Sequence, residues 1–188
     1  MMKPSKFAKD VEPGVIRHAL EGDRHACEAI YRIFERPVYT LALRICQCDQ
    51  DAMDVLQETF IQVFTRLHQF AGDAPFWTWL RKVAVNCSLA RLRKRRQMPV
   101  QWSDPASTAV TNDAGIQMDL TTALGKLPAD ARAVVWLYDV EGLTHKEIAD
   151  QFGKSISFSK TQLSRAHARL RDLLEPNREI PCATTATP

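Results

Sequence analysis

Residues 51–70, with the sequence DAMDVLQETFIQVFTRLHQF, place apolar side chains three and four positions apart. This spacing predicts a helix with one buried face, made of Ala52, Val55, Leu56, Phe60, Val63, Leu67 and Phe70. The opposite face carries a stripe with steps of four, three and four residues, made of Asp54, Glu58, Ile61 and Thr65. The pattern alone is compatible with a solvated face or a binding surface. A catalytic carboxylate pair lacks support, because nothing nearby supplies a second acid, a metal-ligand set or a phosphate-binding loop.

The rest of the chain predicts an all-α protein, because it has seven glycines among 188 residues and few alternating apolar and polar runs. Helical periodicity falls into two groups, at about residues 15–96 and 120–174. We therefore predict two small helical domains, 15–97 and 119–175, joined by a flexible linker at 98–118. Residues 1–14 are expected to form an N-terminal tail and residues 176–188 a disordered C-terminal tail. Pro37 lies inside an apolar pattern and predicts a kink or break there.

Composition favours a soluble cytoplasmic protein. The net charge of +3 is too small to indicate nucleic-acid binding by itself. Five cysteines without framework spacing indicate free thiols in a reducing compartment. No signal peptide or membrane-spanning run is apparent, so we expect no membrane insertion. Cys46 and Cys48 have no matching second pair, and we predict neither a metal site nor a cofactor.

A strongly basic segment follows the helix predicted at residues 51–70. Residues 81–96 contain seven Lys or Arg residues and no acid. A helix from about residue 78 to 96 would bury Leu80, Val83, Ala84 and Cys87. Its opposite face would present Trp79, Lys82, Asn86, Leu89, Arg93 and Arg96. Cations together with an amide suit phosphate neutralisation and contact with bases.

The aromatic residues that begin this segment have two possible roles. Unpaired bases could stack on Phe76, Trp77 or Trp79, or occupy the adjoining loop. The alternative is that Phe76 and Trp79 belong to the core, which is the commoner environment for large aromatic side chains.

The second group of helices has a helix-turn-helix pattern. Pro128 is placed to start a helix and Gly142 to stop it. Thr144 and Glu147 have the spacing of a capping box, and the helix that they begin should end near Gly153. A longer helix from about residue 157 to 174 would carry an outward stripe with Lys160 on its flank, made of Phe158, Gln162, Arg165 and Arg169. Phe158 could contact a thymine methyl group or pack against Phe152.

Three segments resemble one bacterial family. Residues 51–60, DAMDVLQETF, closely resemble the D-A-x-D-x-x-Q-E-T-F signature of region 2.2 in extracytoplasmic-function (ECF) sigma factors of the sigma-70 family. Residues 76–86, FWTWLRKVAVN, and the basic residues 93–94 resemble regions 2.3 and 2.4. Residues 142–149, GLTHKEIA, and 163–166, LSRA, resemble region 4.2, although residues 157–159 differ from the usual family sequence.

The resemblance implies a non-enzymatic promoter-recognition subunit. Its expected partners are core RNA polymerase, through the β′ clamp and β flap, promoter DNA with its single-stranded non-template strand, and an anti-sigma factor. The implied polymerase contacts are Asp51, Asp54, Gln57, Glu58 and Ile61. The implied minus-10 contacts are Asp73, Ala74, Phe76, Trp77, Trp79, Lys82, Asn86, Arg93, Lys94 and Arg96. The implied minus-35 contacts are Thr144, His145, Ser157, Phe158, Ser159, Lys160, Thr161, Gln162 and Arg165. The alternative is a stand-alone helix-turn-helix regulator that binds duplex DNA without polymerase.

Overall fold

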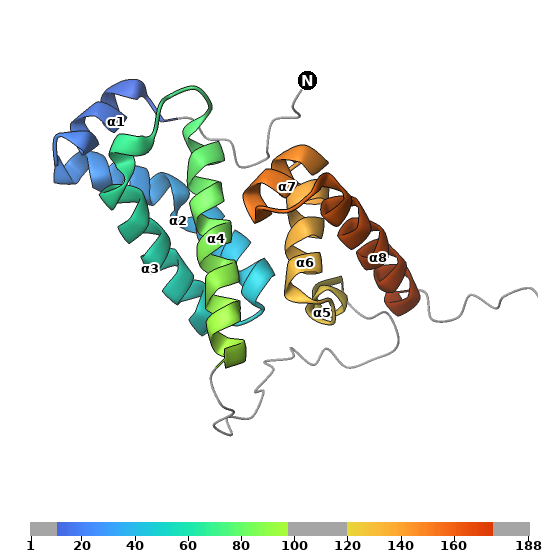
Figure 1. The fold of residues 1–188 in the computed structure, drawn as a ribbon. Helices are drawn as coiled ribbons and strands as arrows, with labels where there is room; N and C mark the ends of the chain where they lie inside the picture. Colours follow the sequence, from blue (N-terminus) through green and yellow to red (C-terminus); the bar gives the residue numbers. More distant parts are fainter. Residues whose placement is uncertain (1–10, 98–119, 175–188) are drawn as a thin grey trace, which may run out of the picture.

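A computed structural model describes residues 11–97 and 120–174, and these residues form helices and no strand (Figure 1). The all-α prediction is confirmed. The first group contains α1 (Pro13–Leu20), α2 (Arg24–Cys46), α3 (Asp49–Thr65), the 3-10 turn η1 (Leu67–Gln69) and α4 (Phe76–Gln97). The second contains α5 (Leu120–Gly125), α6 (Ala129–Val135), the π-helical turn η2 (Trp136–Val140), α7 (His145–Phe152) and α8 (Ile156–Leu174). The predicted linker and C-terminal tail lie outside the described residues, as does most of the predicted N-terminal tail.

The first group is built around α2, which packs against α1, α3 and α4. Ile30, Phe34 and Val38 on α2 have no exposed surface. The ring of Phe34 stacks on Trp77 of α4 with centroids 5.8 Å apart. The apolar face predicted for residues 51–70 is buried, apart from Phe70, which is half-buried. This core sets α3 and α4 side by side, with one face of each helix left to solvent.

Helix α2 runs through Pro37 without the break that the sequence suggested. Proline removes one backbone hydrogen bond and crowds the preceding turn. Buried neighbours on both sides, Phe34 and Val38, hold the helix in the core across this position. The helix ends at Gln47, which adopts a left-handed conformation with φ of 56°.

The helix-turn-helix prediction is confirmed by α7 and α8. Thr144 Oγ1 accepts a hydrogen bond from the Glu147 amide, and Glu147 Oε2 accepts one from the Thr144 amide at 2.8 Å. These two bonds satisfy amides that the start of α7 would otherwise leave unpaired. Gly153 ends α7 in a left-handed conformation with φ of 61°, which a residue with a Cβ atom rarely adopts.

The two groups of helices pack against each other, and α6 lies beside α4 (Figure 1). The Glu141 carboxylate, which follows η2, accepts hydrogen bonds from Trp77 Nε1 at 3.2 Å and from Arg81 Nη1 at 3.1 Å. Arg132 of α6 donates from Nε to the Ile45 carbonyl at the end of α2, 2.9 Å away. All four side chains in these contacts are buried. The groups therefore meet through a buried polar interface.

Candidate functional site

The outer face of α3 is the first candidate surface, and we call Asp54, Gln57, Glu58 and Ile61 the α3 stripe. Ile61 is 62% exposed, which is high for a large apolar residue. Gln57 and Glu58 are exposed, whereas Asp54 is half-buried and pairs with Arg91 Nη2 at 2.6 Å. The stripe thus places an apolar side chain beside carboxylates, a combination that suits a partner with cationic and apolar groups.

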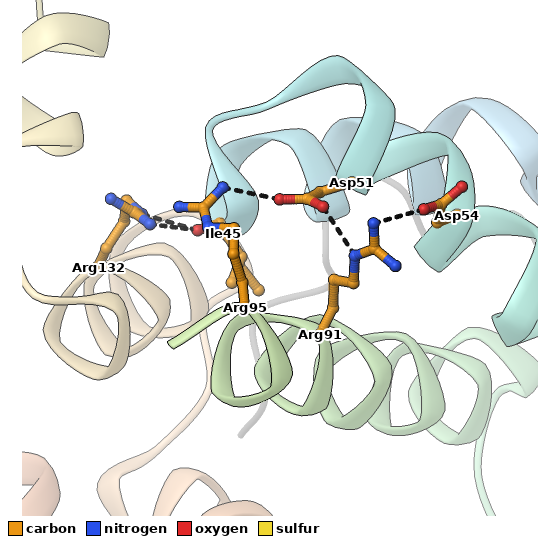
Figure 2. A network of polar contacts seen from close by, with 6 residues as sticks. All are labelled: Ile45, Asp51, Asp54, Arg91, Arg95 and Arg132. Atoms are coloured by element: carbon orange, nitrogen blue, oxygen red, sulfur yellow. Dashed lines mark hydrogen bonds and ion pairs between the residues drawn. The ribbon is translucent and has the colours of Figure 1, made fainter. Parts of the chain in front are cut away.

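Asp51 does not belong to this stripe, which corrects the expectation that it faces outward. The residue is 4% exposed and lies between α3 and α4. Arg91 Nε donates to Asp51 Oδ1 and Arg95 Nη1 donates to Oδ2, each at 2.7 Å (Figure 2). Asp51 is one helical turn before the buried Val55, so the helix turns both side chains inward.

The outer face of α4 is the second candidate surface. Lys82, Asn86, Arg93 and Lys94 are exposed, as the helical spacing predicted. Leu89 was expected on the same face but is buried. Arg96 lies in α4, but its side chain is outside the described residues. The face combines an amide that can contact bases with cations that can contact phosphates.

The aromatic side chains at the start of α4 belong largely to the core. Phe76 and Trp77 are each 1% exposed, so neither can stack on a base in this structure. Trp79 is half-buried and packs against Phe70 and Phe76, with centroids 5.8 and 5.7 Å away. These residues correct the stacking hypothesis for Phe76 and Trp77. The preceding loop, including Asp73 and Ala74, is exposed.

The third candidate surface is the start of α8 with the start of α7. Its exposed members are Thr144, Ser157, Lys160, Thr161 and Arg165, and Gln162 is half-buried. Ser159 is fully buried and its hydroxyl lies 3.1 Å from His145 Nδ1. Ser159 therefore supports the turn instead of presenting its side chain to DNA, which corrects its predicted role.

Two aromatic contacts shape the helix-turn-helix. Phe158 is half-buried and packs against Phe152, with centroids 5.6 Å apart. Of the two roles considered for Phe158, contact with a thymine methyl group and packing against Phe152, the structure shows the packing. His145 stacks on Tyr138 of η2 at 4.6 Å. Both contacts tie the turn to the helices that flank it.

No group of three or more His, Cys, Asp or Glu side chains within 11–97 and 120–174 is arranged to hold a metal ion. No helix in these ranges is long and apolar enough to span a bilayer. Cys46 is buried at the end of α2, and burial raises the pKa of its thiol to about 11.

Family comparisons match both groups of helices. The family described as Sigma-70 region 2 matches residues 30–98, and Sigma-70, region 4 matches residues 117–170. The ECF RNA polymerase sigma factor SigE of Mycolicibacterium smegmatis is 32% identical over 73% of this chain and 57% of its own length. SigM of Mycobacterium tuberculosis is 29% identical over 81% of this chain and 79% of its own. The chain belongs to the ECF sigma factors.

Solved structures agree on the fold of this ECF sigma factor. RpoE of Bartonella quintana, in complex with the anti-sigma factor NepR, aligns with a TM-score of 0.63 at 22% identity and covers 80% of this chain and 98% of its own. CnrH, in complex with the cytosolic domain of CnrY, aligns with a TM-score of 0.57 at 23% identity, covering 87% and 96%. Sigma factors initiate transcription without enzymatic activity, and the fold described above is theirs.

Several polar contacts within this sigma factor were not predicted from sequence. Arg81, Arg91 and Arg95 were counted as part of a basic run, yet each pairs with a carboxylate. Glu141 and Arg132 were assigned no role, yet they join region 4 to region 2. The contacts Arg91–Asp51, Arg95–Asp51, Arg81–Glu141 and Arg132–Ile45 join residues at least 40 positions apart in the chain, so no local periodicity could have revealed them.

Proposed function

We propose that this sigma factor binds core RNA polymerase through the α3 stripe and reads promoter DNA with α4 and α8, in the cytoplasm. The observation that carries the proposal is that α3 and α4 share one core while turning chemically different faces to solvent. One face is acidic and apolar, and the other is basic with an amide. A protein partner and a DNA strand can therefore bind the same module at once.

The polymerase contact is assigned to the α3 stripe without Asp51. Ile61 supplies an exposed apolar centre, and Glu58 and Gln57 supply polar groups around it. Interfaces of this kind gain affinity from the central apolar residue and selectivity from the charges. The family resemblance supports the β′ clamp as the partner surface of the α3 stripe, and the β flap as a second contact for the region 4 module.

The minus-10 contact is assigned to the exposed face of α4 and the loop before it. Asn86 can donate to and accept from a base edge, and Lys82 can neutralise a phosphate. The exposed loop with Asp73 and Ala74 is the candidate site for a flipped base of the non-template strand. Arg93, Lys94 and Arg96 are assigned to the phosphate backbone, and Trp79 keeps a partly exposed edge beside this surface.

The minus-35 contact is assigned to the start of α8, whose exposed side chains can enter the major groove. Ser157, Thr161 and Gln162 are the candidate base contacts, and Lys160 and Arg165 the candidate phosphate contacts. Thr144 and His145 at the start of α7 can contact the backbone, because amides at a helix start favour anions.

The polymerase contact can be tested with Glu58→Arg in the full chain. Reversing this exposed charge should weaken binding to purified core polymerase at least 10-fold, because like charges then face each other. Glu21→Arg, an exposed charge reversal at the end of α1 and outside the α3 stripe, is the matched control and should bind normally. Equal affinity of the parent and Glu58→Arg for core would remove the α3 stripe from the interface.

The minus-10 contact can be tested with Asn86→Ala. The variant should bind core polymerase normally but form open promoter complexes at least 10-fold less, measured by permanganate footprinting on a cognate promoter. Loss of one good base contact costs about 1–3 kcal/mol. Normal promoter opening by Asn86→Ala would contradict the assignment.

We also propose that an anti-sigma factor regulates this chain. Two solved structures with the same fold, RpoE and CnrH, are complexes with NepR and the cytosolic domain of CnrY, respectively. A partner that covers the α3 stripe would block polymerase. Crosslinking from Ile61 in cells should capture such a partner in addition to polymerase, and capture of polymerase alone would contradict this part of the proposal.

A further inference from the structure

We propose that Asp51 determines DNA specificity by withholding Arg91 and Arg95 from the phosphate backbone. This inference rests on the proposed function of α4 as a DNA-contacting helix. It gives Asp51 a positioning role, distinct from the polymerase contact that the sequence suggested. The carboxylate acts on DNA binding through the two arginines and touches no nucleotide itself.

Both carboxylate oxygens of Asp51 have arginine partners. Its two oxygens each accept a hydrogen bond from a different guanidinium of α4, at 2.7 Å (Figure 2). Arg91 is forked between two carboxylates, since its Nη2 also pairs with Asp54. A carboxylate as buried as Asp51 must keep cationic partners, because removing one leaves a charge without compensation. Both arginines are thereby held toward α3.

The cations of α4 fall on two faces of the helix. Arg91 and Arg95 are four residues apart, so they lie one above the other on the face toward α3. Arg93 is two residues from each of them and lies on the opposite side of the helix. Arg93 and Lys94 are exposed and make no ion pair with any residue that the structure describes. Among the described side chains of residues 91–95, half of the four cations are thus paired with carboxylates of α3.

This division matters because phosphate contacts carry no sequence information. Each additional contact strengthens binding to any DNA and steepens the dependence on salt, by a slope of about 0.9 per phosphate. Two more free arginines would raise affinity for arbitrary sequence without helping Asn86 distinguish bases. By engaging them, Asp51 leaves a larger share of the binding energy to base contacts.

The experiment measures binding of the full chain to a fluorescein-labelled duplex of arbitrary sequence over a range of KCl concentrations. Asp51→Asn keeps the size of the side chain and removes its charge, so Arg95 is released while Arg91 keeps its pair with Asp54. We expect tighter binding at low salt and a slope of log K against log salt steeper by about 1. A purely structural role would weaken binding. An unchanged or shallower slope would overturn the proposal.

Two further variants keep the test valid if Asp51→Asn folds poorly. Arg95→Gln should leave the slope unchanged, since Arg95 is already engaged, and Arg93→Gln should reduce it by about 1. Equal reductions from both variants would overturn the inference while supporting DNA contact by α4. No reduction from Arg93→Gln would instead contradict DNA contact by α4, and with it both proposals.

Discussion

Cys46 shows how burial at a single residue controls chemistry. The thiol lies in the core at the end of α2, and desolvation raises its pKa to about 11 from the ordinary 9.0. The thiolate is the nucleophile, so its fraction at pH 8 should be about 100-fold lower than that of an ordinary thiol. In iodoacetamide labelling of the folded protein, Cys46 should react at least 100-fold more slowly than the half-exposed Cys48, as resolved by tandem mass spectrometry. Equal rates would contradict the burial.

The same shift has a consequence for stability. Because the folded state keeps Cys46 protonated more firmly than the unfolded chain does, its contribution is present below pH 9 and is lost as pH rises toward 11. Cys46→Ser should therefore flatten the fall in unfolding free energy over this alkaline range, measured by urea denaturation. An unchanged alkaline slope would show that other groups cause it.

Residue-level prediction from sequence succeeded where exposure follows from helical spacing. Glu58, Ile61 and Asn86 were placed on outer faces, and the structure exposes them. It failed at Asp51, because a carboxylate is usually exposed and only its two arginine partners make burial tolerable.

At the scale of the element, the capping box of α7 orders the helix-turn-helix. Thr144→Ala removes the side-chain oxygen that accepts the Glu147 amide, and should cost about 1 kcal/mol of unfolding free energy. Thr144→Ser keeps the oxygen and should cost much less. Chemical denaturation followed by circular dichroism measures both. Equal losses from the two variants would show that the methyl group of Thr144 matters more than the cap.

The existence of the helices was predicted more reliably than the residues at which they begin and end. The periodicity that identifies α3 and α8 extends over several turns, so it survives small errors. Helix α4 begins at Phe76, two residues before the predicted start, because Phe76 and Trp77 pack into the core as part of its first turn. Of the kink or break predicted at Pro37, the break is absent, because tertiary packing continues α2 past a residue that disfavours helix.

At the scale of the whole molecule, Glu141 links the two modules. Its carboxylate is 3% exposed and pairs with Arg81 of region 2. Glu141→Gln removes the charge and leaves the Arg81 charge in a buried site without its carboxylate. Breaking a buried ion pair from one side costs about 3–5 kcal/mol. The variant should have a larger radius of gyration in small-angle X-ray scattering.

Asp150→Asn is the matched control for this measurement. Asp150 is an exposed acid of region 4 on α7, and its neutralisation should leave the radius of gyration unchanged. If Glu141→Gln were as compact as Asp150→Asn and the parent, Arg132 and the apolar contacts would be sufficient to hold the modules together.

The contact between modules could not be predicted from sequence. Arg81 and Glu141 are separated by 60 residues, including the whole linker. Helical periodicity reports which face of a helix is buried, but not which of several buried faces it meets. The sequence therefore predicted two modules and not their arrangement.

The polar interface around Glu141 and Arg132 has a thermodynamic consequence for promoter use. Elements named minus-10 and minus-35 lie about 25 base pairs apart, which is roughly 85 Å along the DNA axis at about 3.4 Å per base pair. On the proposed function, modules that pack against one another must separate to reach both elements together. The free energy that holds Trp77 and Arg81 against Glu141 is therefore subtracted from the observed affinity for the promoter, in the way that any unfavourable pre-equilibrium lowers affinity. On the proposed function, Glu141 therefore contributes to the binding energy that polymerase and promoter must supply before transcription begins.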